Sequence, residues 1–275
     1  MPSTGATNVT AGHSTPLIPE QRQAKLLQLL RDEGIVGTRI LTDYLGVSHM
    51  TVRRDIAALE AEGRVVSVKG GVRLASAGPI GAEPPRERLS RAVLELPRKT
   101  AIARFAAGVI ADAMVIYLDA GTTCQALVPL LADKKDLTVV TNDFLIATSL
   151  FDLPNVEIIH TGGIVDRSSG SSSGRLAANT LGAINLDLFF MSTGAWSISR
   201  GVSSFSLDKV ELKTAAMAAS SECILLADST KYGANAKFHV APLAKLDMIV
   251  TDDQLPERTS GRITDLGVEL HTVTP

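Results

Sequence analysis

The chain has 275 residues, of which 45% are hydrophobic and 20% are charged, with a formal net charge of −2 at pH 7. This length allows two domains, and this hydrophobic content excludes a chain that is disordered throughout. The near-neutral charge argues against a protein that coats nucleic acid along its whole surface. The charge is uneven, because residues 1–75 contain 9 Lys and Arg against 7 Asp and Glu, whereas the remainder is acidic. A small basic head on an acidic body suits a local contact with DNA.

The cysteine content and the apolar runs indicate the compartment. Cys124 and Cys223 lie far apart without the spacing of metal ligands, so we expect two reduced thiols and no metal site. No secretory hydrophobic segment opens the chain, and no apolar run reaches transmembrane length. We therefore expect a cytoplasmic protein without a membrane partner. Residues 1–18 lack periodicity and are expected to form a disordered tail.

The stretch 36–55 has the pattern of two short helices joined by a tight turn, and a supporting helix is expected before it at residues 20–33. Thr38 is the expected N-cap of the first short helix. The apolar face of that helix is expected to consist of Ile40, Leu41 and Leu45. Gly46 follows this face, where a helix C-cap favours a residue that tolerates positive φ.

The second short helix is expected to be capped by Ser48 and to bury one side. Its inward residues are expected to be Val52, Ile56 and Leu59. This helix-turn-helix pattern makes the second helix a candidate for the major groove of DNA. The candidate DNA-binding residues here are Thr38, Ser48, His49, Met50, Thr51, Arg53 and Arg54. The alternative is an ordinary helical hairpin with a solvated charged face.

The segment VVSVKGGVRL contains two short β-rich runs around Lys69-Gly70-Gly71 and predicts a β-hairpin. The order of three helices and a hairpin predicts a winged helix-turn-helix domain over residues 19–74. Lys69 and Arg73 are then expected on the wing, where flexible cations suit contact with phosphate.

The run GVSHMTVRRDIAALEAEGRVVSVKGGV resembles the N-terminal signature of the DeoR family of bacterial transcriptional regulators, and the match extends from about Arg22 to Val72 without a gap. The resemblance implies that this part binds double-stranded operator DNA. The chain departs from the family pattern in the hairpin, where Val66 and Lys69 stand in place of other residues, including a histidine before the glycines.

Residues 75–97 are expected to form a linker, because Pro79, Pro84 and Pro85 forbid a long helix at its start. A short helix is possible before Pro97. Over residues 98–275, apolar β-type runs alternate with helical patterns, which predicts an α/β domain with a mostly parallel sheet covered on both faces. The expected strands are residues 114–118, 137–141, 156–160, 188–192, 223–227, 248–251 and 269–272.

Four polar turns follow expected strands, at residues 119–123, 141–142, 161–163 and 228–233. In open α/β sheets, ligands bind beyond the carboxyl ends of the strands. The turn 119–123 combines a glycine, two hydroxyl groups and a helix N-terminus, which together suit a phosphate. Lys231 could add a positive charge, and Asn142 could bind hydroxyl groups. The alternative is that these segments are only turns and helix caps.

The runs YLDAGTT, LTVVTND, IIHTGG, LLADSTKYG and LDMIVTDD resemble the sensor domain of the DeoR family, so that the resemblance covers about residues 19–272. That domain is similar in fold to ribose-5-phosphate isomerase and binds sugar phosphates. One departure is the segment ADAM at 111–114, where Ala113-Met114 replaces the glycine of a usual Asp-Gly turn before the strand. The resemblance implies effector contacts from Asp119, Gly121, Thr122, Thr123, Thr141, Asn142, Gly162, Gly163, Lys213 and Lys231.

The likeness to an isomerase makes an enzyme a real alternative, namely a sugar-phosphate isomerase with an attached DNA-binding head. Such an enzyme needs carboxylates beside the sugar to move protons. By an approximate alignment, the carboxylates of the isomerase would fall near Met191, Gly194 and Lys213, although Glu211 lies close. We therefore expect no catalytic residues. The segment Gly170–Gly174 fits the pattern G-x-S-x-G, but it lies in a serine run and is expected to be a flexible loop.

The sequence therefore predicts a transcriptional regulator, expected to be a repressor, of genes of carbohydrate or sugar-acid catabolism. The resemblance implies control by a phosphorylated sugar, polyol or sugar acid, no cofactor, and a homo-oligomer that is either a dimer or a tetramer. A third alternative is a structural adaptor that binds protein through the helical head, which the arginine pair and the wing disfavour.

Overall fold

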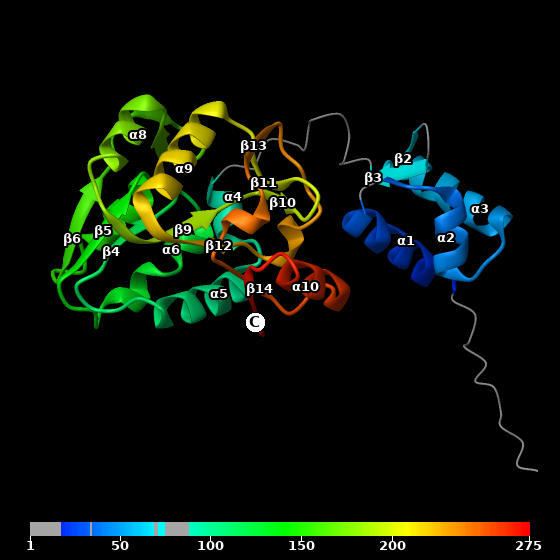
Figure 1. Cartoon of the computed structure of the whole chain (residues 1–275), viewed down its shortest axis with the longest axis horizontal. Helices are drawn as coiled ribbons and strands as arrows, with labels where there is room; N and C mark the ends of the chain where they lie inside the picture. The colour runs from blue at the N-terminus through cyan, green and yellow to red at the C-terminus, as the bar shows by residue number, and fades with distance from the viewer. Residues whose placement is uncertain (1–17, 34, 69–70, 75–87) are drawn as a thin grey trace, which may run out of the picture.

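The computed structural model describes residues 18–33, 35–68, 71–74 and 88–275 (Figure 1). Most of the expected N-terminal tail and the wing residue Lys69 lie outside these residues. The described part contains a small helical domain before residue 75 and a larger α/β domain after residue 87, drawn in blue and in green to red.

The N-terminal domain is a winged helix-turn-helix, as predicted. Its helices are α1 (Pro19–Glu33), α2 (Thr38–Leu45) and α3 (His49–Ala61), and its strands are β1 (Ile35–Val36), β2 (Val65–Val68) and β3 (Gly71–Leu74). The strands form an antiparallel sheet in the order β1-β3-β2. The domain has its own core, because the apolar side chains buried in it all come from residues 26–74.

The turn between α2 and α3 confirms two predicted caps and corrects two other predictions. Gly46 ends α2 with φ of 64°, and the Ser48 hydroxyl accepts a hydrogen bond from Thr51 N. Thr38 is not the N-cap, because Gly37 holds that position and Thr38 is the first helical residue. Ile40 is not part of the apolar face, since its side chain is 58% exposed, and Leu41 and Leu45 alone are buried in α2. In a helix of this length, Leu41 and Leu45, which are four residues apart, form the face that packs on the core.

The larger domain is built on a seven-stranded sheet in the order β15-β14-β12-β9-β4-β5-β6. Every pairing in this sheet is parallel, which confirms the predicted mostly parallel sheet. Its strands are β4 (Val115–Leu118), β5 (Leu137–Thr141), β6 (Val156–His160), β9 (Leu186–Ser192), β12 (Ser220–Leu226), β14 (Met248–Asp252) and β15 (Glu269–Val273).

Helices cover both faces of the sheet, and alternate residues of β4 show the two cores. Ile116 and Leu118 pack on one side with residues of α5 (Leu96–Gly108), α6 (Thr122–Gln125) and α7 (Phe144–Leu150). Tyr117 packs on the other side with residues of α8 (Arg175–Leu181), α9 (Leu207–Ala219) and α10 (Glu257–Thr264). In the view of Figure 1, α8 and α9 lie above the sheet and α5 below it.

Proline positions explain where the helices differ from the predictions. A short helix, α4 (Arg88–Val93), lies inside the predicted linker, and α5 begins at Leu96, so that Pro97 occupies its first turn. A proline is tolerated there because its missing N–H group would have no helical partner. The turn 119–123 leads into α6, and the 3₁₀ helix η2 (Val128–Leu131) follows as a separate element, because Pro129 cannot continue an α-helix.

Two small sheets were not predicted. One pairs β7 (Ile164–Asp166) with β8 (Ser171–Ser173), and the other has the order β10-β11-β13, with β10 (Ala195–Ser197), β11 (Gly201–Ser204) and β13 (Phe238–Ala241). The prediction of a flexible serine loop was wrong, because the residues of β8 form a buried strand. Trp196 in β10 is buried edge-to-face against Tyr232, with ring centroids 5.0 Å apart. Two further 3₁₀ helices are η3 (Ser229–Lys231) and η4 (Leu243–Lys245).

Candidate functional site

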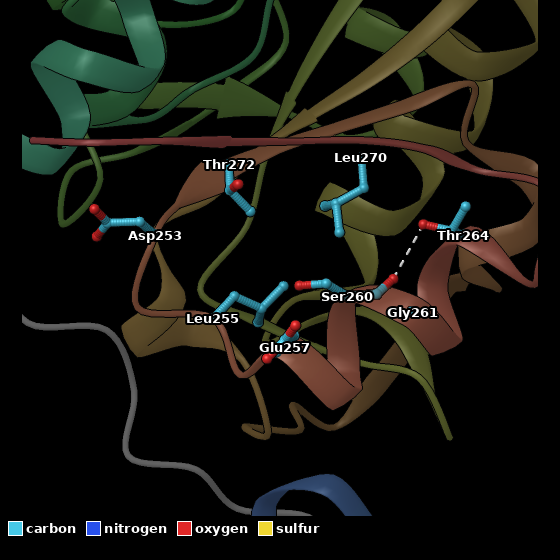
Figure 2. A pocket seen from close by; sticks show the side chains of 8 residues that line it. All are labelled: Asp253, Leu255, Glu257, Ser260, Gly261, Thr264, Leu270 and Thr272. Carbon is cyan, nitrogen blue, oxygen red and sulfur yellow. Dashed lines mark hydrogen bonds between the residues drawn. The ribbon is translucent and has the colours of Figure 1, made fainter.

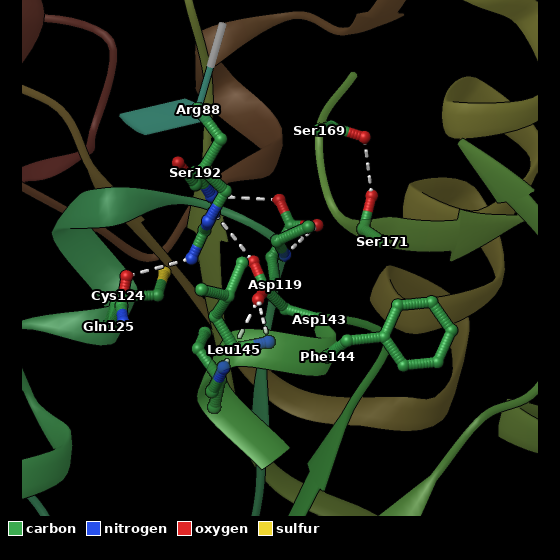
Figure 3. A network of polar contacts seen from close by, with 12 residues as sticks. Arg88, Asp119, Cys124, Gln125, Asp143, Phe144, Leu145, Ser169, Ser171 and Ser192 are labelled. Carbon is green, nitrogen blue, oxygen red and sulfur yellow. Dashed lines mark hydrogen bonds and ion pairs between the residues drawn. The ribbon is translucent and has the colours of Figure 1, made fainter. Parts of the chain in front are cut away.

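The carboxyl ends of β9, β4 and β5 meet in the larger domain because these strands are neighbours in the sheet. Ser192, Asp119 and Asn142 stand at or just beyond these ends. Figure 3 shows Asp119 and Ser192 together with nearby polar side chains from α4, α6 and the β7–β8 turn. The sequence predicted a ligand site at this edge.

Asp119 is the buried centre of this network. Its Oδ1 accepts a hydrogen bond from Ala120 N at 2.9 Å, and its Oδ2 accepts one from Ser192 N at 2.9 Å. The same Oδ2 pairs with the ammonium group of Lys213, which also donates to Ser192 O at 2.7 Å. The fold thus brings two predicted effector residues together as an ion pair, so Lys213 alone supplies little net charge for an anion.

A glycine is required at position 121 because the end of β9 lies too close to its backbone to leave room for a side chain. Its φ of 173° is extended backbone, but a Cβ atom at this position would lie 2.1 Å from Ser192 Oγ. The close neighbour is therefore a side chain of the protein. Thr122 and Thr123 follow as the first residues of α6. The backbone N–H groups of a helix's first turn have no helical acceptor, so they are available to an anion.

The side chains of Thr141 and Asn142 form hydrogen bonds that hold neighbouring segments of the site in place. The Thr141 hydroxyl donates to Leu118 O at 2.8 Å. The side-chain oxygen of Asn142 accepts from Tyr117 Oη and from Ala120 N, both at 3.0 Å, and its Nδ2 donates to Ser172 O at 2.7 Å. Both lone pairs of this oxygen are used, which leaves one amide hydrogen of Asn142 for a ligand.

A second buried ion pair lies beside the first and was missed from the sequence. Arg88 of α4 places Nη1 2.7 Å from Asp143 Oδ2, and its Nη2 donates to Gln125 Oε1 at 2.9 Å (Figure 3). Asp143 also caps α7 by accepting hydrogen bonds from Leu145 N and Ile146 N. Asp143 was within a quoted motif but received no role, and Arg88 stood in the predicted linker without any periodic signal.

The electrostatics of the network favour binding over nucleophilic chemistry. Burial raises the pKa of the Cys124 thiol well above its ordinary value, and the Asp119 carboxylate adds to the shift. This thiol therefore stays protonated. Burial also raises the pKa of Asp143, although Arg88 opposes the shift. Glu211, which stood close to a catalytic position in the isomerase alignment, is exposed and lies 3.9 Å from Arg175.

Lys231 and the pair Gly162-Gly163 lie further along the same edge, on opposite sides of Asp119. Lys231 follows β12, and its ammonium group is 3.9 Å from Asp228 Oδ2, with 35% of the side chain exposed. Gly162 and Gly163 follow β6 with φ of 66° and 112°. Within the described residues, no hydrogen bond or ion pair joins Lys231 or these glycines to Asp119 or Lys213.

A surface pocket of about 590 Å³ lies between α10 and β15, at the far edge of the sheet (Figure 2). Its lining residues are Asp253, Leu255, Glu257, Ser260, Gly261, Thr264, Leu270 and Thr272. Two of these side chains are carboxylates and none is a cation, so this pocket does not suit a phosphorylated ligand.

Within the described residues, no group of three or more His, Cys, Asp or Glu side chains is arranged to hold a metal ion. In the same part of the chain, no helix has the length and apolar character needed to span a membrane.

The N-terminal domain presents an exposed face at the start of α3. Met50, Arg53 and Arg54 are exposed, and Met50 is 70% exposed. Their spacing of i, i+3 and i+4 puts them on one face of the helix. His49 is also exposed, whereas Thr51 is half-buried and engaged with the Ser48 cap.

Thr38 and Arg73, two other predicted DNA-binding residues, are half-buried and hydrogen-bonded within the domain. Thr38 is half-buried, and its carbonyl accepts a hydrogen bond from the Thr42 hydroxyl at 2.8 Å. Arg73 lies in the central strand of the small sheet, half-buried, and donates to Leu74 O at 3.1 Å. Asp55 of α3 pairs with Arg22 of α1 through two contacts of 2.8 and 3.0 Å, which fixes the orientation of α3.

A winged helix-turn-helix that presents two arginines, joined to a parallel α/β domain with a polar site at its strand ends, defines a DNA-binding transcriptional regulator with a sensor domain. The family models agree with this class. The DeoR-like helix-turn-helix domain matches residues 22–77, and the DeoR C terminal sensor domain matches residues 95–253. The chain belongs to the DeoR family of transcriptional regulators.

Related proteins carry names of the same kind. An HTH-type transcriptional regulator of Haemophilus influenzae, described as uncharacterized, is 41% identical over 94% of this chain and 98% of its own length. The transcriptional repressor AccR of Agrobacterium fabrum is 30% identical over 85% of this chain and 89% of its own. Ribose 5-phosphate isomerase A of Neisseria gonorrhoeae has a TM-score of 0.36 and 14% identity over 49% of this chain and 52% of its own, too low to bear on function.

Proposed function

We propose that this protein is an operator-binding repressor of genes that serve the use of sugars or sugar acids. Its affinity for DNA is set by a phosphorylated sugar, polyol or sugar acid that binds at the carboxyl edge of the sensor sheet. The observation that carries the proposal is the exposed face of α3, because Met50, Arg53 and Arg54 have no structural partner in the described part of the protein that would explain them.

These three side chains have the chemistry that reads base edges. An arginine forms paired hydrogen bonds with guanine O6 and N7, at roughly 1–3 kcal/mol of discrimination per contact, and an apolar side chain contacts the thymine methyl group. Ser48 at the start of α3 stands where backbone and side-chain groups contact phosphate. The name of the relative AccR supports a repressor over an activator.

The test of the reading helix is a gel-shift assay with DNA from the protein's own promoters. Arg54→Ala should weaken operator binding by roughly tenfold to a hundredfold and relax the base preference at one position. Arg64→Ala is the matched control, because Arg64 lies beyond the far end of α3 and pairs with Glu62 on the surface. Unchanged affinity and sequence preference in Arg54→Ala would rule out α3 as the reader.

The proposed effector site combines the free N–H groups at the start of α6, the hydroxyl groups of Thr122 and Thr123, and the partly exposed ammonium group of Lys231. The ion pair of Asp119 with Lys213 is neutral as a unit, so we assign it the role of a support that orients the turn. Asn142 and Thr141 hold the same turn from the side of β5. Gly162 and Gly163 border the site on the side of β6.

Differential scanning fluorimetry against phosphorylated sugars, polyols and sugar acids tests this site. We expect at least one compound to raise the melting temperature of the wild-type protein, because a ligand that binds only the folded state stabilises it. Lys231→Ala should reduce the shift, whereas Lys245→Ala, which removes an exposed charge at η4, should not. A panel without any hit, or hits that survive Lys231→Ala, would contradict the site.

We also propose that the site binds without catalysing isomerisation. Its two carboxylates, Asp119 and Asp143, are each held in a buried ion pair, and Glu211 lies outside the network. A coupled assay with ribose 5-phosphate should therefore show no turnover above the uncatalysed rate. Sustained turnover would replace the proposal by the isomerase alternative.

A further inference from the structure

Arg88 links the sensor site to the segment that leads to the DNA-binding domain. It is the first residue of α4, and only residues 75–87 separate it from Leu74 at the end of β3. Its side chain is 5% exposed and enters the polar network from outside the sheet (Figure 3). Its aliphatic stem passes close to the β7–β8 turn, since a Cβ atom on Gly170 would lie 3.7 Å from Arg88 Cδ.

The guanidinium group contacts the two helices that flank the proposed effector turn. Its Nη2 donates to Gln125 at the end of α6, and its Nη1 lies 2.7 Å from Asp143, the cap of α7. Asp143 directly follows Asn142, whose side-chain oxygen holds Ala120 in the turn. Arg88 therefore contacts the helix that begins with Thr122 and Thr123, and also the residue that follows Asn142.

The hydrogen bonds of Arg88 are incomplete. Its Nε has no hydrogen-bond acceptor among the described residues, and the approach of Nη1 to Asp143 Oδ2 is an ion pair that lacks hydrogen-bond geometry. A buried donor without an acceptor is costly, at about 1–3 kcal/mol. A guanidinium group presents Nε–H and Nη–H as a planar fork that fits two oxygen atoms of a phosphate.

We propose that Arg88 is the positioning residue that couples the effector site to the DNA-binding domain. The anionic group of the effector accepts hydrogen bonds from the Arg88 guanidinium, whose Nε–H has no acceptor among the described residues, and thereby weakens the attraction of this cation for Asp143. Because Arg88 joins α4 to α6 and α7, this weakened attraction changes the position of α4, the described helix that follows the DNA-binding domain in the chain. The inference rests on the proposed control by a phosphorylated effector.

The measured quantity is the coupling ratio, which is the Kd for operator DNA with probe divided by the Kd without probe. The probes are ribose 5-phosphate, glycerol 3-phosphate, 6-phosphogluconate and inorganic phosphate, each added at saturating concentration to the full-length protein. In the wild type, the most effective probe should give a ratio of roughly 5–150, the usual range of coupling between two sites.

Two variants separate coupling from folding. The double variant R88Q/D143N removes both charges and keeps an amide at the cap of α7, where Asn is a good substitute. It should bind operator DNA within about threefold of the wild type without probe, but its coupling ratio should approach 1. R88K keeps the charge but lacks the planar fork, so its ratio should fall between the two. R175Q, which removes an exposed arginine from α8, should behave as the wild type.

The possible results distinguish the role of Arg88 from the proposed control by an effector. Wild-type coupling in both R88K and R88Q/D143N overturns the role of Arg88 and leaves the proposed function intact. If no probe binds the wild type or alters its operator affinity, the effector proposal fails, and the role of Arg88 fails with it. A loss of thermal stability in the variants with an unchanged ratio identifies Arg88 as a structural residue only and also overturns the inference.

Discussion

Ala113 adopts a left-handed backbone conformation, with φ of 62°, in the turn that precedes β4. Its N–H donates to Lys135 O at 2.9 Å, so the turn is held in place. A residue with a Cβ atom is strained by roughly 1–2 kcal/mol in this conformation, whereas glycine adopts it without strain. Ala113 is the residue at which the sequence departs from the usual Asp-Gly turn, and this backbone strain is the energetic cost of the departure.

We therefore predict that Ala113→Gly stabilises the protein by about 0.5–1 kcal/mol, because relief of strain exceeds the extra entropy of the unfolded chain. The melting temperature measured by calorimetry should rise by roughly 2 °C. Ala132→Gly, in an ordinary helical conformation, is the control and should lower it. A fall in the melting temperature of Ala113→Gly would show that the turn is not strained.

Asp166 connects the pH dependence of stability to the β7–β8 turn. Burial raises the pKa of Asp166, but hydrogen bonds from Ser169, Ser168 and Lys209 outweigh burial, so the pKa lies below its ordinary value of 3.8. A carboxylate with a lowered pKa contributes stability above its unfolded-state pKa, and that contribution is lost as the pH falls through the folded-state pKa. Asp166 therefore stabilises the folded protein at neutral pH but not in acid.

Asp166→Asn should lower the free energy of unfolding at pH 7 by about 1 kcal/mol, a small value because 35% of the side chain is exposed to screening solvent. The difference between variant and wild type should shrink as the pH is lowered below about 4. Urea denaturation of both proteins at pH 7 and below about pH 4 measures this difference in the free energy of unfolding. An equal or larger difference in acid would contradict the assignment.

Single residues divide clearly into those that the sequence could predict and those that it could not. Gly46 and Ser48 were predictable because caps depend on local backbone geometry. The bracing role of Asn142 and the burial of Arg88 were not, since both depend on side chains more than 20 residues away. The polar edge of the sheet could be predicted, but the pairing of its charges could not.

At the level of elements, α4 belongs with the sensor domain. It lies within the predicted linker and ahead of the matched sensor region, which begins at residue 95. Lys99 of α5 joins it to that domain, because the buried ammonium group donates to Leu94 O at 2.5 Å and also to Arg91 O. Helix α4 is thus attached at one end by Arg88 and at the other by Lys99.

We predict that a fragment of residues 95–275 is less stable than one of residues 86–275 by about 3–5 kcal/mol. The shorter fragment leaves Asp143 as a buried carboxylate without a cation, which costs an energy of this size. Guanidinium denaturation of both fragments checks this value. Equal midpoints would place α4 outside the cooperative unit of the sensor domain.

The strands of the large sheet were predictable as elements because strands buried on both faces are continuous apolar runs. The strands β7, β8, β10 and β11 were missed because each has only three or four residues, too few for a clear alternation of apolar and polar residues, and β8 and β11 are rich in serine. Contacts with residues distant in sequence help to place such strands. The serine run is a clear case, because Ser172 N donates to Asn142 O at 2.8 Å.

At the level of the whole molecule, two domains could be predicted because each part has its own pattern of buried residues. The described structure confirms separate cores for residues 26–74 and for the α/β part. The proposed coupling between the two parts could not be predicted, since Arg88 lies in the predicted linker without any periodic pattern.

Because the described part of each chain contains one helix that we propose to read DNA, we predict that operator DNA is bound by two copies. The protected sequence should contain two half-sites related by two-fold symmetry, with centres about 10–10.5 base pairs apart or a multiple of that spacing. Hydroxyl-radical footprinting and sedimentation of the protein–DNA complex measure the spacing and the stoichiometry. A single protected half-site with one bound chain would contradict this prediction.

The burial of Trp196 has a practical consequence for spectroscopy. It is the single tryptophan of the chain, its indole is fully buried, and it contacts Tyr232, the residue after Lys231. Its emission should therefore be that of an indole shielded from water, and the whole signal originates beside η3. Ligand-induced movement at that end of the sheet should change the wavelength or quantum yield of this light, so stopped-flow traces can time the event in unlabelled protein.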